Sequence, residues 1–123
     1  MGADFQRRRT FDLHPESVRA ARAFVRELAD GAGADAEAAA LLASELAANA
    51  VIHANSAFEV RVTENGEALR VEIVNDAPEM LAALQEPSDG SGRGLHIVDA
   101  LASRWGTDVM EREKVVWFEL PTT

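Results

Sequence analysis

The sequence has no cysteine among its 123 residues. Disulfide bonds and thiolate metal sites are therefore excluded, because both need cysteine sulfur. No apolar run approaches the ~20 residues that a membrane-spanning helix requires. The N-terminus also lacks the charged-then-apolar pattern of a signal peptide. We therefore expect no contact with a membrane and a cytoplasmic location.

Positive charge is scarce, with 12 Lys and Arg against 21 Asp and Glu and a net charge of −9. This balance argues against nucleic-acid binding, which needs cations to neutralise phosphates. One basic run, Arg7-Arg8-Arg9, goes against the trend. It is interpreted as the solvated edge of a strand or, alternatively, as a patch for an acidic partner.

The composition is otherwise that of a globular protein, with 47% hydrophobic and 27% charged residues. A chain of this length is expected to form one domain, residues 1–123, with residues 1–6 as a frayed end. No internal repeat or linker divides it.

Periodicity and turn signals predict an order of strand, helix, helix, hairpin, loop, helix and strand. The expected elements are a strand at 9–13, a helix from Pro15 to Gly31 or Gly33, a helix from Asp35 to about Ala54, a hairpin around Asn65-Gly66 with strands at 58–62 and 69–73, a loop at 76–93, a helix from Leu95 to about Arg104, and a strand at 115–120. Hairpin strands with segregated helices indicate an α+β two-layer sandwich rather than a doubly wound parallel sheet.

The expected second helix carries a polar stripe. Four apolar residues share one face at helical spacing: Leu41, Leu42, Leu46 and Ile52. Glu45 and Asn49 fall in the middle of this face, where a carboxylate is costly unless it is solvated or paired. A cleft that holds Mg²⁺, water and phosphate would remove the cost, and an Asn oxygen suits Mg²⁺. The alternative is that Glu45 pairs with an arginine and Asn49 bonds to backbone. His53 is interpreted as a packed or hydrogen-bonded histidine rather than a ligand.

Two further segments suit a nucleotide. Asp76 follows the return strand and could accept a hydrogen bond from the adenine amine, although Asp in this position is also a common turn former. The run Gly90-Ser91-Gly92-Arg93-Gly94-Leu95 directly precedes a helix, so its backbone N–H groups could approach phosphate. The alternative is a flexible glycine hinge. The run comes too late for a dinucleotide fingerprint and lacks the Lys-Ser/Thr ending of the Walker loop.

In this order the segments resemble the GHKL ATPase superfamily, whose ATP site is the Bergerat fold. The most similar branch is the anti-sigma-factor serine kinases and their small actinobacterial ATP-binding relatives. Residues 44–54 resemble the family's N box, residues 71–76 its first glycine box and residues 90–98 its second. Residues 114–120 resemble the last strand of the small relatives.

The resemblance implies a two-layer α/β sandwich, with a mixed, mostly antiparallel sheet and about three helices on one face. It implies ATP and Mg²⁺ as ligands, with Mg²⁺ on Asn49. It implies that Glu45 is catalytic, either as the general base or as the group that orients the attacking hydroxyl. It also implies that Asp76 holds the adenine amine. The loop residues would surround the phosphates: Gly90, Gly92, Arg93, Gly94 and Leu95.

By the same resemblance the protein is a serine protein kinase and anti-sigma factor. Its expected partners are a sigma factor and a small antagonist protein, and it could form a homodimer. The chain departs from the family where Pro78 and Met80 replace two glycines, where Val115 replaces a Thr and where Glu113 replaces a Gly. The alternative is therefore a non-catalytic, nucleotide-dependent module that docks a partner. A sensor histidine kinase is disfavoured, because no segment is expected to carry an acceptor histidine on a dimer helix.

Overall fold

The computed structural model describes residues 5–53, 57–75, 98–110 and 113–122. These ranges contain the elements β1 (Phe5–Phe11), α1 (Pro15–Ala32), α2 (Ala36–His53), β2 (Phe58–Glu64), β3 (Ala68–Asn75), β4 (Arg104–Met110) and β5 (Glu113–Pro121). Residues 98–101 add a helical turn before β4. β1 begins at Phe5, so it includes the last two residues of the expected frayed end and stops before Asp12.

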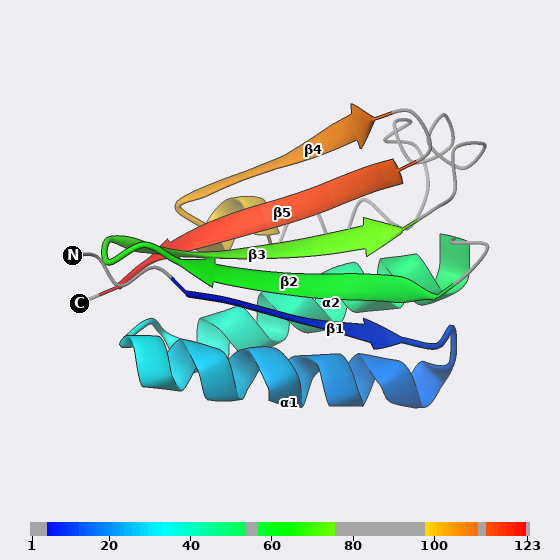
Figure 1. The fold of residues 1–123 in the computed structure, drawn as a ribbon, viewed down its shortest axis with the longest axis horizontal. Coiled ribbons are helices and arrows are strands. Elements are labelled where there is room, and N and C mark those ends of the chain that lie inside the picture. The colour runs from blue at the N-terminus through cyan, green and yellow to red at the C-terminus, as the bar shows by residue number, and fades with distance from the viewer. Residues whose placement is uncertain (1–4, 54–56, 76–97, 111–112, 123) are drawn as a thin grey trace.

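The five strands form one sheet in the order β1-β2-β3-β5-β4. Both long helices cover the same face of this sheet (Figure 1), with α1 packed on β2 and β3 and α2 on β3 and β5. The predicted α+β two-layer fold is confirmed. Every pairing between described strands is antiparallel, so the expected mixed character of the sheet is not seen in this part of the chain.

The helix limits follow from local chemistry. α1 starts at Pro15, whose missing N–H costs nothing in a first turn, and His14 Nδ1 accepts the backbone N–H of Glu16 at 3.2 Å. It ends at Gly33, whose φ of 81° is left-handed and disfavours a side chain. Asp35 then caps α2, because its carboxylate accepts the backbone N–H three residues on at 3.1 Å.

The β2–β3 hairpin turns at Asn65-Gly66, as predicted. Asn65 Oδ1 accepts hydrogen bonds from the backbone N–H groups of Glu67 and Ala68 at 3.0 and 2.9 Å, and Gly66 has a φ of 90°. Thr122 donates its N–H to the carbonyl of Glu67 at 3.0 Å and its hydroxyl to the carbonyl of Gly66 at 3.1 Å. The end of β5 is therefore fastened to this hairpin. The first residue of β1 pairs with the last residue of β2 at the same end of the sheet.

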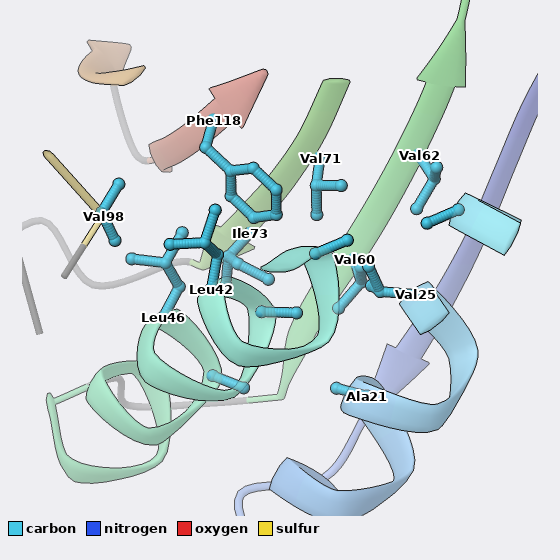
Figure 2. Close-up of a cluster of buried hydrophobic side chains, with 14 of the residues drawn as sticks. Ala21, Val25, Leu42, Leu46, Val60, Val62, Val71, Ile73, Val98 and Phe118 are labelled. Carbon is cyan, nitrogen blue, oxygen red and sulfur yellow. The ribbon is translucent and has the colours of Figure 1, made fainter. Parts of the chain in front are cut away.

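The core lies between the sheet and the two helices. Figure 2 shows Leu42 and Leu46 of α2 pointing toward Ile73 and Phe118 of the sheet, with Val98 beside them. Small residues line the buried faces of both helices, which lets the helices approach each other and the sheet closely. These residues are Ala21, Ala29, Ala39, Ala43, Ala47 and Ala50. Exposed residues 7–9 lie on the edge strand β1, which fits a solvated strand edge.

The helix-free face of the sheet is built around Trp117. The Arg70 guanidinium lies 4.0 Å from the centre of the Trp117 ring and also pairs with Glu72 at 2.9 Å and Glu119 at 3.2 Å. On the neighbouring strand, Gly106 stands directly opposite Trp117. The indole ring therefore lies flat over a residue without a side chain, held between charged neighbours.

We expect Gly106→Ala to destabilise the protein by roughly 1–3 kcal/mol, the usual cost of overpacking. A methyl group at this position would lie 2.8 Å from Cζ2 of Trp117, closer than real contacts allow. Urea unfolding measures the change. Gly31→Ala in α1 is the matched control, because nothing lies within 4 Å of its added methyl group. An equal midpoint for both variants would contradict the packing role of Gly106.

Candidate functional site

The structure places Glu45 and Asn49 at the edge of the buried face of α2, where both are half-buried. The prediction that Leu41 and Ile52 belong to the buried face is wrong, since they are 42% and 70% exposed. The buried face is instead made mainly of alanine, because only small residues fit between α2, α1 and the sheet. Glu45 and Asn49 thus avoid the cost of full burial and remain open to a ligand.

This edge of α2 adjoins the side of the helix that carries Leu42 and Leu46. Glu45 lies one turn after Leu42 and Asn49 one turn after Leu46, so each pair shares one side of the helix. Figure 2 shows that Leu46 points toward Val98. The carboxylate and the amide therefore lie next to the side of α2 that packs into the core with Val98.

The alternative explanation of this polar pair finds no support in the described part of the chain. There, Glu45 forms no ion pair with an arginine, and the Asn49 side chain forms no hydrogen bond with a described residue. The arginines that form ion pairs between described residues bind other carboxylates, such as Glu37 on α2 and Glu119 on β5. Two polar groups are therefore left to bind something other than these residues.

A second polar group lies where β3 ends and β5 begins. Asn75 and Lys114 are each 6% exposed and stand opposite each other in the β3–β5 register. Burial lowers the pKa of Lys114 from 10.5 to about 8, because the charged form loses hydration. Neither residue was predicted to belong to the site. The available signal was that Lys114 is the single lysine in a chain that otherwise uses arginine.

The remaining predicted site residues lie outside the described residues. They are Asp76, Gly90, Gly92, Arg93, Gly94 and Leu95. Figure 1 shows that the last turn of α2, the end of β3 and the start of β5 all lie at one end of the molecule. The described parts of the candidate site therefore converge there.

Two open hollows also lie near this end of the described structure. The larger, of about 500 Å³, lies between the end of β1 and the start of α1 and includes Arg9 and His14. The smaller, of about 270 Å³, includes Asn75 together with Glu59 and Glu113. Two carboxylates would repel a polyphosphate, so the smaller hollow does not suit the anionic part of a nucleotide.

Comparison with known families gives a match over most of the chain. A family model described as a histidine kinase-like ATPase domain matches residues 11–119. No curated protein sequence matches the chain. Within the described residues, no helix is long and apolar enough to cross a membrane.

Proposed function

Because the chain belongs to the family of histidine kinase-like ATPase domains, we propose that it binds Mg-ATP and phosphorylates a serine of a small antagonist protein. In the same proposal it acts as an anti-sigma factor, and the antagonist reverses its hold on the sigma factor. The family supports ATP-dependent regulation in general. The serine acceptor and the two partners rest on the resemblance of residues 44–54 and 90–98 to the anti-sigma-factor kinases.

The observation that carries the proposal is the state of Glu45 and Asn49. Both are half-buried on one edge of α2, four residues apart, and neither is bound by another described residue. A carboxylate and an amide on one side of a helix, with no partner among the described residues, suit a reaction that needs a proton acceptor and an oxygen ligand. A merely structural pair would bond to its neighbours.

The donor set fits Mg²⁺. Among the described residues, no group of three or more His, Asp or Glu could hold a metal ion by itself. Mg²⁺ does not need such a group, since it takes few protein ligands and completes its shell with water and phosphate. Asn49 would hold the ion, which when bound neutralises phosphate charge.

The chain's own residues would then position the reactants. Glu45, one turn from Asn49, would accept the proton of the serine hydroxyl as that oxygen attacks the γ-phosphorus. The bond to the β–γ bridging oxygen breaks and ADP leaves. Phosphoryl transfer depends chiefly on positioning and charge neutralisation, so the rigid spacing of these two side chains on α2 is the central element.

One observation favours a second candidate, a module that docks a partner without catalysis. Val115, which replaces a Thr of the resembling family, is buried in β5 with 3% exposure. Its apolar side chain cannot hydrogen-bond a base or a neighbouring carboxylate. The departures at Pro78 and Met80 point the same way. A homodimer is compatible with either function.

Mg-ATP is expected to bind the protein with sub-millimolar affinity in isothermal titration calorimetry, and Asn49→Ala is expected to weaken it at least tenfold. The loss follows from removing the oxygen that holds Mg²⁺. Adding EDTA to the native protein should produce a similar loss. Alanine is a strong helix former, so α2 should stay intact.

Glu37→Ala is the matched control for this experiment. Glu37 lies in the first turn of the same helix, is exposed and pairs only with Arg26 among the described residues. Its removal should leave the affinity unchanged. A native protein that releases no heat with Mg-ATP, with or without metal, would refute nucleotide binding. Binding without transfer would favour the docking module.

A further inference from the structure

Asn75 and Lys114 are the only polar or charged residues in the buried set of the described chain. They are cross-strand neighbours, because Asn75 of β3 pairs with Lys114 of β5. Directly opposed residues of an antiparallel pair have Cβ atoms about 4.5–5.5 Å apart. An amide and an ammonium group are thus brought together at one point of an otherwise apolar layer.

Both side chains lie on the face of the sheet that the helices cover. Asn75 follows Ile73 by two residues and Lys114 precedes Val116 by two, and side chains alternate between faces along a strand. Ile73 is in the core and Val116 packs against it. The two polar residues therefore continue the core surface beyond its apolar edge, at the end of the sheet where the last turn of α2 also lies (Figure 1).

Lys114 is buried without a counter-charge from any described residue. It forms no ion pair or hydrogen bond with a described residue. A buried charge normally has a partner, since its desolvation is costly. The lowered pKa of Lys114 has burial as its cause and reflects the same cost.

We propose that Asn75 and Lys114 contact the nucleotide, with the Asn75 amide pairing with the edge of the adenine base and the Lys114 ammonium binding its phosphates. This rests on the proposed function. An amide offers one donor and one acceptor side by side, which matches the amine and ring nitrogen of adenine. The ammonium group supplies the positive charge that binds a polyphosphate. Lys114 is the only lysine of the chain, whose other basic residues are arginines and histidines.

The test compares Mg-ATP with Mg-tripolyphosphate, which has no base, by calorimetry. Lys114→Met is expected to weaken both ligands about 10- to 100-fold, as for the loss of a charged hydrogen bond. Asn75→Ala is expected to weaken ATP about 3- to 10-fold and to leave tripolyphosphate unchanged. Arg22→Met, which removes the same charge from the exposed face of α1, should change neither.

Thermal unfolding distinguishes a role of Lys114 in nucleotide binding from a role in stabilising the fold. Lys114→Met removes a buried charge that no described residue pairs, so its unfolding midpoint should equal or exceed that of the native protein. A second measurement uses an acyl-phosphate derivative of ATP, in which an amine near the phosphates attacks the acyl carbon and releases ATP. Lys114, the chain's one lysine, should be acylated, and free Mg-ATP should protect it.

Failure of this inference differs from failure of the proposed function. Native protein that does not bind Mg-ATP refutes both. Native binding with unchanged affinities in Lys114→Met and Asn75→Ala overturns the inference alone. So does a Lys114→Met midpoint well below the native value, which would assign Lys114 a structural role, or acylation that spares Lys114.

Discussion

Glu45→Ala is expected to slow phosphoryl transfer about 10²- to 10⁴-fold, which is the usual contribution of a positioned base, while ATP still binds. Glu45 lies on the accessible edge of α2 and bonds to no other described residue, so its removal leaves no partner unsatisfied. Alanine also favours a helix. The rate is measured as transfer of the γ-phosphoryl group of labelled ATP to the antagonist serine in a single turnover, with affinity measured separately by calorimetry.

Two control variants test whether a rate loss in Glu45→Ala comes from the loss of a proton acceptor at this position. Glu37→Ala removes a carboxylate from the same helix away from the site and should keep the native rate. Glu45→Gln keeps the size of the side chain but cannot take a proton, so it should be nearly as slow as the alanine variant. A rate loss fully explained by weaker ATP binding would make Glu45 a binding residue. An unchanged rate would exclude it as the base.

Phe118→Ala is expected to lower the free energy of unfolding by about 3–5 kcal/mol, as large-to-small changes of buried aromatic residues do. Phe118 is fully buried in β5 and faces Leu42 and Ile73 (Figure 2). The vacated space adjoins α2, whose small residues cannot move to fill it. Because small domains are stable by only about 5–15 kcal/mol, the variant loses a large share of its stability.

Guanidinium unfolding followed by circular dichroism measures this loss. Val109→Ala is the matched control on the adjacent strand β4, where the valine is 47% exposed and should cost less than about 0.5 kcal/mol. Similar values for the two variants would contradict the position of Phe118 at the centre of the core. A stable Phe118→Ala protein that binds small apolar molecules would show instead that the cavity persists.

The parts of the fold that depend on local chemistry could be predicted. Pro15 and Gly33 limit α1, Asp35 caps α2, and Asn65-Gly66 forms the hairpin turn, because each acts through its own backbone or nearest neighbours. β4 was missed. Its residues Arg104–Met110 directly follow the expected helix, and Gly106 within them was not interpreted as the start of a new element.

What stops that helix is tertiary contact. Ser103 donates its N–H to the carbonyl of Glu119 at 2.9 Å, and Trp105 Nε1 donates to Asp99 at 2.9 Å. The first hydrogen bond joins the chain to β5 of the sheet, and the second links β4 to the preceding helical turn. Glu119 lies 16 residues beyond Ser103, outside the range of helical periodicity, so the pattern of the sequence alone predicted helix up to Arg104.

In the candidate site too, local features could be predicted and tertiary ones could not. The spacing of Glu45 and Asn49 correctly indicated that they share one side of a helix. It did not indicate which side of α2 is buried. The buried side consists mainly of alanine, and the larger Leu41 and Ile52, which are exposed, gave a stronger apolar signal on another side. Asn75 and Lys114 were missed because they meet only across strands 39 residues apart in sequence, through the β3–β5 register.

The attachment of both strand ends to the Asn65-Gly66 hairpin has a practical consequence. β1 begins and β5 ends beside that turn, at the opposite end of the sheet from Asn75 and Lys114. Any polypeptide fused to either end of the described fold would therefore leave from the side remote from the proposed nucleotide contacts. An affinity tag or fluorescent reporter could be joined there without obstructing ligand entry.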